Sequence, residues 1–298
     1  MLTLFSIPKA FSGSAGILQV NAIGSWIRLG AECDVILFGD EPGMTQVAAK
    51  FGVRHVPELQ RNSEGTPILS DVFSRADALA RHPLLCFVNS DIVLFNDILA
   101  ASNIVAARRR NFLMVSSRFN LQIEEALAFG PDWEQLLRER AVGESRMYPA
   151  AGSDIFVYPR GLFGAVPPFA IGRGYWDNWL IRRSVQLGAS VIDATGTVVP
   201  VHQDHDYRHI AHSRPEGPSE ADVLASAEGQ RNLALAGGRG RLYTIYDATV
   251  VLTADGRLVS TLRPSLIWRR IKAWLRRMIA TSAPVILLWS VLPASLTH

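Results

Sequence analysis

The sequence predicts an α/β fold built on a doubly wound parallel sheet. Short apolar runs that suit buried strands alternate with segments of helical period along the first third of the chain. Polar residues, some of them acidic, follow two of these strands directly. Strands that alternate with helices of this length pair in parallel and carry helices on both faces of the sheet.

The elements of the first third are predicted from their apolar period and their end signals. LTLFSI and DVILFG suit buried strands, and isoleucines at helical spacing mark a helix between them. Gly52 is a typical stop for the helix after the second strand. In order, we expect a strand at 2–7, a helix through 17–27, a strand at 34–39, a helix at 41–52, a strand at 53–56, a helix at 67–82 and a strand at 84–89.

The later elements are less regular. We expect strands at 111–117, 153–159 and 190–195, a Trp-containing helix between the first two of these, a helix at 175–188 and a hairpin at 250–260. Asp255 and Gly256 suit the turn of that hairpin. The one compositional break falls near Pro264, so we expect a single domain over 1–263 and a tail over 264–298.

Composition limits the class of protein. With 48% apolar and 19% charged residues among 298, the chain is globular and large enough for a sizeable core. Cys33 and Cys86 are the only cysteines, and each lies in a strand-like run. We therefore expect no disulfide framework, and we expect the protein to be in a reducing compartment. The first residues show no export signal, so we expect a cytoplasmic protein.

The charge is unevenly distributed. The net charge is +3, yet residues 265–298 contain five basic residues and no acidic one, which leaves the rest mildly acidic. A nucleic-acid-binding protein would carry its basic face on the folded body. We therefore expect no nucleic-acid partner.

The stretch CFVNSDIVLF, residues 86–95, ends a buried strand on polar side chains. Ligands of an open α/β sheet bind beyond the carboxyl ends of its strands, where Asn89, Asp91 and Asp40 are expected. One carboxylate there could hold base or ribose hydroxyls and the other a divalent metal on a diphosphate. Alternatively, Asn89 and Asp91 cap a helix or shape a turn.

FVNSDIVL, together with LTLFSIPKAF and DVILFGDEPG, resembles the nucleotide-sugar-dependent glycosyltransferases of the GT-A fold, over roughly residues 2–210. FVNSDIVL stands where that family carries its DxD motif. The resemblance implies a mixed, Rossmann-related sheet, a UDP- or GDP-linked sugar donor, a hydroxyl acceptor on a glycan, lipid-linked or other molecule, and Mn²⁺ or Mg²⁺. Asn89 makes this an NxD variant. An amide oxygen can bind a metal but adds no charge, so Asp91 would supply most of the metal affinity.

The resemblance also implies roles for individual residues. His202 would bind the metal from a later segment, beside the NxD residues. The implied donor-binding residues are Ile7, Pro8, Asp40, Arg75, Asn89, Ser90 and Asp91. Arg75 could equally be a solvated surface residue. His205, His209 and His212 have a spacing that would place them on one helical face, which leaves a zinc site as an alternative.

GYWDNWLI, residues 174–181, is similar to the acceptor and general-base segment of inverting GT-A enzymes. Asp177 could take the proton of the attacking hydroxyl, while Trp176 and Trp179 stack on a sugar. The alternative is a helix N-terminus with Asp177 in its first turn and the tryptophans in the core. Asp154 is a candidate for contact with acceptor or donor sugar, or a simple turn residue.

The tail contains SLIWRRIKAWLRRMIA, which places apolar residues on one helical face and basic residues on the other. This pattern indicates a helix on an anionic membrane surface, and the apolar run after it is too short to span a bilayer. The peripheral site would be the cytoplasmic face. The alternative is a helix docked on this protein or on a second subunit.

Two other functions remain open from sequence. A sugar-1-phosphate nucleotidyltransferase would need a Gly-rich, cationic loop after the first strand, and SIPKAFSGSAG is not a well-formed one. A non-enzymatic carbohydrate-binding protein would explain the aromatic residues but not the acids at two strand ends.

Overall fold

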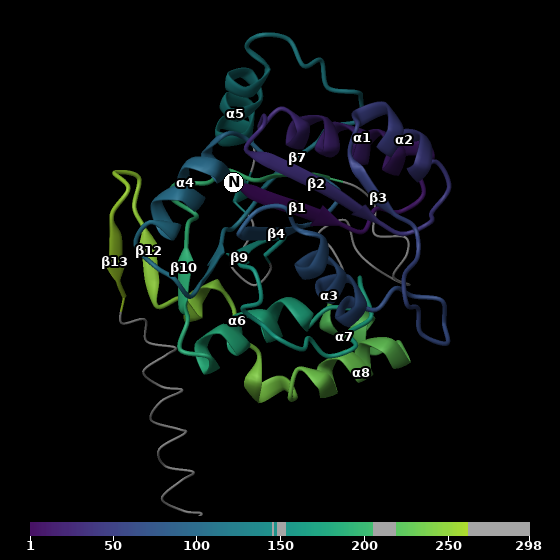
Figure 1. Ribbon diagram of the computed structural model, residues 1–298, viewed down its shortest axis with the longest axis vertical. Coiled ribbons are helices and arrows are strands. Elements are labelled where there is room, and N and C mark those ends of the chain that lie inside the picture. The colour runs from purple at the N-terminus through teal and green to yellow at the C-terminus, as the bar shows by residue number, and fades with distance from the viewer. Residues whose placement is uncertain (145, 148–152, 205–218, 262–298) are drawn as a thin grey trace, which may run out of the picture. The chain divides into compact units, whose positions relative to one another are not determined.

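The computed structural model describes residues 1–144, 146–147, 153–204 and 219–261. One compact unit extends from Met1 to Thr261 (Figure 1). Its described part contains a nine-stranded mixed sheet and a second sheet of four short strands. The predicted α/β class with a doubly wound mixed sheet is therefore confirmed.

The main sheet is parallel except at two strands. Its strands in sheet order are β13 (Leu258–Ser260), β12 (Val250–Leu252), β10 (Ser190–Asp193), β6 (Phe112–Val115), β9 (Ile155–Pro159), β4 (Leu84–Val88), β1 (Leu2–Ser6), β2 (Cys33–Phe38) and β3 (Arg54–Val56). β9 lies antiparallel between β4 and β6, and β13 forms the predicted hairpin with β12. The alternation of strands and helices in the first third of the chain predicts parallel pairs. It does not extend to the later segment that supplies β9, so it could not predict that β9 is antiparallel.

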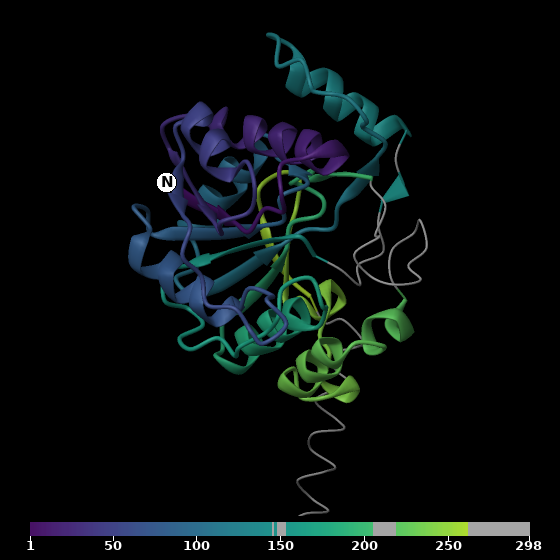
Figure 2. The ribbon, with the colours of Figure 1, turned by 90° about the vertical axis from the view of Figure 1, so that its right-hand side faces the viewer.

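Helices cover both faces of this sheet (Figure 2). Successive side chains of a strand point to opposite faces, so Leu4 packs in one core and Phe5 in the other. One face carries α1 (Gly13–Ile27), α2 (Met44–Phe51) and α4 (Asp97–Ala106). The other carries α3 (Leu69–Leu79), α6 (Trp176–Gln186), α7 (Glu220–Leu224) and α8 (Ala227–Leu235). Two 3₁₀ turns, Arg239–Arg241 and Ile245–Asp247, follow α8.

The second sheet lies beside the carboxyl end of β4. Its order is β5 (Ile92–Val93), β11 (Val201–Gln203), β7 (Phe119–Leu121) and β8 (Arg146–Met147). A small core that includes Phe95 and Leu137 joins it to α5 (Trp133–Glu144). His202 lies inside β11, between Ile92 and Asn120 on the neighbouring strands.

Two predicted features lie outside the described residues. They are the cluster His205, His209 and His212, and the tail 264–298. The zinc and membrane readings therefore stay predictions, as does the domain boundary after residue 263. In the part of the chain that the structure describes, no helix has the length and apolar character needed to cross a membrane.

Candidate active site

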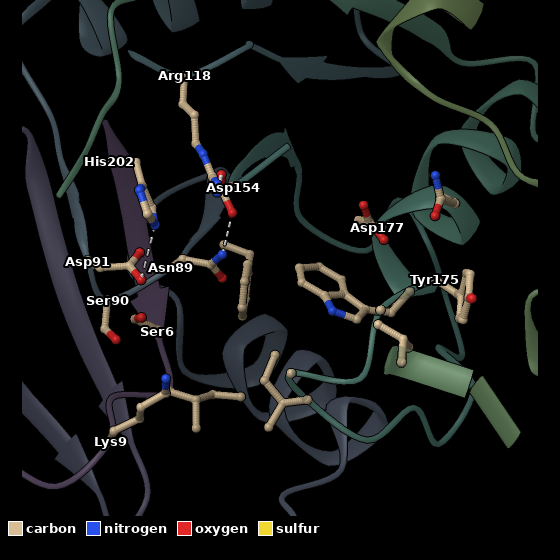
Figure 3. A pocket seen from close by; sticks show the side chains of 18 of the residues that line it. Ser6, Lys9, Asn89, Ser90, Asp91, Arg118, Asp154, Tyr175, Asp177 and His202 are labelled. Atoms are coloured by element: carbon tan, nitrogen blue, oxygen red, sulfur yellow. Dashed lines mark hydrogen bonds and ion pairs between the residues drawn. The ribbon is translucent and has the colours of Figure 1, made fainter. Parts of the chain in front are cut away.

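A cavity of about 400 Å³ lies at the carboxyl ends of β1 and β4 (Figure 3). This is the edge of a parallel sheet where ligands bind, and the volume suits a small-molecule site. The residues that line it come from distant segments: Ser6, Ile7, Lys9, Phe87, Asn89, Ser90, Asp91, Arg118, Asp154, Ile171, Gly172, Gly174, Tyr175, Trp176, Asp177, Asn178, His202, Glu220 and Val223.

The turn that carries Asp91 is fixed by hydrogen bonds from α1 and β11. Ser90 Oγ donates to Gln19 Oε1 at 3.1 Å, and the indole of Trp26 donates to the carbonyl of Ile92 at 2.9 Å. The buried amide of Gln203 donates to the carbonyl of Asp91 at 3.1 Å. These bonds hold the backbone of the turn, so the carboxylate of Asp91 is presented from a rigid support.

Asp91 and His202 face one another across the wall of the cavity. His202 Nε2 lies 3.7 Å from Asp91 Oδ2, and the imidazole is 2% exposed. Its other nitrogen, Nδ1, lies 3.4 Å from Asp204 Oδ1. An acid beside the second nitrogen of a histidine is common where the first binds a metal.

This pair is a candidate for binding one divalent ion. Adjacent ligands about 2.1 Å from an octahedral ion are separated by roughly 3 Å. Asp91 Oδ2 and His202 Nε2 lie 3.7 Å apart, so a shift of less than about 1 Å would bring them to that separation. The described residues include no cluster of three or more His, Cys, Asp or Glu that could hold a metal alone. Remaining ligands would therefore be the amide oxygen of Asn89, water and the phosphates of a substrate.

Asp154 contacts two other residues of the site and is itself buried. Its carboxylate accepts hydrogen bonds from the Asn89 amide and from the Arg118 guanidinium (Figure 3). The Asn89 backbone N–H also donates to the Asp154 carbonyl at 3.0 Å. Both side chains of the Arg118–Asp154 pair are only 10% exposed. Asp154 is thus a structural partner of the NxD turn rather than a free acid.

Asp177 lies on the opposite side of the cavity from Asp91 (Figure 3). It occupies the first turn of α6. Burial raises the pKa of its carboxyl to about 6, and the charge of Asp154 adds to the rise. The backbone N–H of Asn178 opposes the shift by stabilising the ionised form. A carboxylate with such a pKa is suited to accept a proton near neutral pH.

The segment that presents Asp177 is strained. Tyr175 adopts φ 69°, the only positive φ of a non-glycine residue in the described chain. Gly172 and Gly174 just before it also have positive φ, at 73° and 69°. A bulky residue in this conformation costs free energy, and such residues concentrate at functional sites. The Tyr175 side chain is buried at the cavity wall beside Trp176.

Four predicted site residues lie elsewhere. The side chain of Asp40 is 65% exposed and pairs with Arg61, whose hydrogen bond and charge lower the pKa of the Asp40 carboxyl. Arg75 pairs with Asp71 one turn away on α3. Trp179 packs against Phe163 and Phe169 in the core. It lies three residues after Trp176 on α6, on the helix face that packs against the sheet. Pro8 is buried and does not line the cavity, unlike Ile7.

Arg118, Ser6 and Glu220 are among the cavity residues that sequence reasoning missed. Arg118 follows the end of β6 closely, so the rule that selected Asp91 could have found it. Ser6 ends β1, is 1% exposed, and its hydroxyl has no hydrogen-bond partner within the described residues. Glu220 carries no signal in the sequence, since only the fold brings α7 to this site.

No protein-family model and no curated protein sequence matches the chain. Solved structures similar to it include glucosyl-3-phosphoglycerate synthase from Mycobacterium tuberculosis with Mn²⁺, UDP and glucosyl-3-phosphoglycerate. That match has 17% identity and a TM-score of 0.47, and it covers 80% of this chain and 81% of the other. These likenesses are distant.

Two further similar structures come from Pyrobaculum calidifontis and S. aureus. The mannosyltransferase PcManGT from Pyrobaculum calidifontis, with GDP-Man and Mn²⁺, has 13% identity and a TM-score of 0.45 over 78% of this chain and 66% of the other. TarS from S. aureus, with UDP-GlcNAc, has 12% identity and a TM-score of 0.45 over 79% and 70%. At these values the matches assign no activity to this chain.

Proposed function

We propose that this protein is a GT-A-type glycosyltransferase that moves a hexose from a nucleoside-diphosphate sugar to a hydroxyl acceptor, assisted by Mn²⁺ or Mg²⁺. One observation carries the proposal. A single cavity has Asp91 and His202, which we propose as metal ligands, on one wall and Asp177, whose carboxyl has a pKa of about 6, on the other. Sugar transfer needs these two functions on opposite sides of the reacting carbon.

The charges of the cavity support a metal on the donor. Two cations, Lys9 and Arg118, share its wall with four carboxylates: Asp91, Asp154, Asp177 and Glu220. Arg118 is already paired with Asp154. A diphosphate would be repelled by this set of charges unless a divalent cation lay between the phosphates and Asp91. When bound, the metal would neutralise charge on the departing nucleoside diphosphate.

On the acceptor side, Asp177 would accept the proton of the attacking hydroxyl, which makes inversion of the anomeric centre the expected outcome. Trp176 lies in the same wall and offers an apolar surface, while its ring packs edge-on against Phe87. Ser6 and Ile7 at the end of β1 are placed to contact the nucleoside.

The test is calorimetric titration with UDP and with GDP, each with and without Mn²⁺. We expect one nucleotide to bind tightly only with metal, because the carboxylates repel it otherwise. Asp91→Ala should abolish the metal-dependent part, whereas Asp132→Ala, on an exposed residue outside the cavity, should not change it. Equal affinity with and without Mn²⁺, or full binding by Asp91→Ala, would contradict the proposal.

A further inference from the structure

Asn89 provides an amide where the GT-A family that this chain resembles has a carboxylate. The structure shows which side chains face this amide. Asn89 Nδ2 donates to Asp154 Oδ1, and Arg118 Nη1 donates to Asp154 Oδ2. Asp154 lies one residue before β9, which pairs antiparallel with β4, so the two backbones also meet. The contact is therefore built into the main sheet.

From this geometry we infer that Asp154, held by Arg118, is a positioning residue that turns the Asn89 amide so that its carbonyl oxygen faces the cavity beside Asp91. The inference rests on the proposed function and adds two residues to its metal-binding turn. An ionised carboxylate can only accept hydrogen bonds, so the amide nitrogen must face it. The oxygen of Asn89 then points away from Asp154.

Because the Arg118–Asp154 pair is buried, breaking it is costly in free energy, and this keeps Asp154 in place to orient Asn89. The Arg118–Asp154 pair is shielded from water, and losing one partner of such a pair leaves an uncompensated charge. Arg118 is itself anchored, since its Nε donates to Asn120 Oδ1 at 3.0 Å on β7. The second sheet thus holds Arg118, Arg118 holds Asp154, and Asp154 holds Asn89.

The same geometry explains why position 89 is not an aspartate. A carboxylate there would point an acceptor at the acceptor of Asp154, and two like charges in contact cannot both ionise freely. Adding a charge by Asn89→Asp would therefore disrupt the turn instead of improving it. Only an exchange of both residues would restore a matched pair.

The donor and acceptor pattern makes that exchange a sharp test. In Asp154→Asn, the introduced amide has one acceptor atom for two donors, Asn89 and Arg118. In Asn89→Asp, two carboxylates meet. In the double variant Asn89→Asp/Asp154→Asn, the amide at position 154 donates to the carboxylate at position 89, and its oxygen accepts from Arg118. Every donor and acceptor is matched again, and the negative charge that compensates Arg118 stays within the cluster, at position 89.

The experiment measures thermal unfolding without metal and Mn²⁺ affinity by calorimetry for the wild type, both single variants and the double variant. We expect each single variant to lower the unfolding midpoint by about 2–6 °C. Each should weaken Mn²⁺ binding at least about 10-fold, as is usual when a group supporting a metal ligand is lost. The double variant should recover both quantities. The double variant is the matched control, because it contains the same number of Asp and Asn residues as the wild type.

The outcomes separate this inference from the proposed function. Additive losses in the double variant, or single variants that match the wild type, would overturn the positioning role. If the wild type binds no Mn²⁺ while the midpoints still show rescue, the orientation of Asn89 stands but its purpose in metal binding, and the proposed function, fail. A wild type that binds Mn²⁺ with no loss in either single variant leaves the proposed function intact and rejects only the inference.

Discussion

Asp177 shows how two opposing local effects set the chemistry of one residue. Its place in the first turn of α6 favours the ionised carboxylate through backbone N–H groups, which lowers the pKa. Burial at the cavity wall has the larger effect and raises the pKa to about 6. The result is a group that is ionised at neutral pH and still basic enough to accept a proton from a hydroxyl.

The first prediction concerns catalysis at this residue. Transfer activity, measured as kcat/KM, should rise with pH and level off above a midpoint near 6, because only ionised Asp177 can accept a proton. Asp177→Asn should lower the rate by about 10²–10⁴ with nucleotide affinity nearly unchanged. Steady-state kinetics from pH 5 to 8 and nucleotide titration check both points. An active Asn variant would place the base elsewhere.

The second prediction concerns stability. The carboxyl has its ordinary pKa of 3.8 when unfolded and about 6 when folded, so the native state binds more protons within that window. The free energy of unfolding contributed by Asp177 therefore falls as pH rises from about 4 to about 6. Asp177→Asn lacks this loss and should be more stable than the wild type above pH 6. Urea unfolding at pH 4.5 and 7.5 tests it, and two variants with parallel pH dependence would refute it.

At the scale of elements, the cavity depends on how the second sheet and α1 hold the turn after β4. Gln203 on β11 is the central link, fully buried and bonded to three groups. It accepts from Asn21 Nδ2 at 2.9 Å and donates to the carbonyls of Leu18 and Asp91. Asn21 in turn accepts from the N–H of Leu127 at 2.8 Å. The Gln203 amide therefore links β11 to α1 and to the turn that carries Asp91.

The third prediction follows from this link. Gln203→Leu has nearly the same size but leaves these buried polar groups unpaired, which should cost about 1–3 kcal/mol in the free energy of unfolding. It should also weaken Mn²⁺ binding, because the backbone of Asp91 loses a support. Gln135→Leu, on the exposed side of α5, is the matched control and should change neither quantity. Urea unfolding and metal titration measure the two effects.

The long strands were predictable from the sequence, and the short ones were not. β1, β2 and β4 are apolar runs of five or six residues, buried on both faces, and such runs are recognisable. β5, β7 and β11 have two or three residues each, too few to show any period. The antiparallel direction of β9 depends on pairing between residues far apart in the chain, which no local pattern encodes.

The site was predictable only in part, because a local sequence pattern does not give the direction of a side chain. The rule that ligands lie beyond strand ends selected Asn89 and Asp91, which line the cavity. It also selected Asp40, whose strand ends on the same edge but whose side chain turns to Arg61. Aromatic residues next to Asp177 suggested sugar stacking, yet Trp179 supports the core. Local pattern locates an edge of the sheet but not the direction of a side chain.

At the scale of the whole molecule, the proposed site residues and the predicted tail lie in separate parts of the sequence. Every proposed site residue precedes residue 263, and the five basic residues of 265–298 have no acidic neighbour in that segment. We retain the proposal that the tail binds an anionic membrane surface. Charge attraction there is about 1 kcal/mol per Lys or Arg and is screened over a Debye length of about 8–10 Å.

The fourth prediction tests this separation. A chain ending at Arg263 should fold and bind nucleotide like the full chain, while only the full chain should sediment with anionic liposomes at low salt. Replacement of the five basic residues by Gln is the matched control and should abolish the salt-sensitive part. A shortened chain that unfolds, or a full chain that ignores the liposomes, would make the tail a packing element of the protein instead.

The position of β9 also determines the order in which this molecule can be completed during synthesis. β4 can pair with β1 once residue 88 has been synthesised, but the partner of its other edge, residues 155–159, is synthesised much later. Until then a growing chain exposes an apolar strand edge that can pair with other chains. Because Asp154 arrives with β9, the nascent protein closes that edge and supplies the partner of Asn89 in one step. We therefore expect fragments that end before Pro159 to aggregate rather than to fold into a half-site.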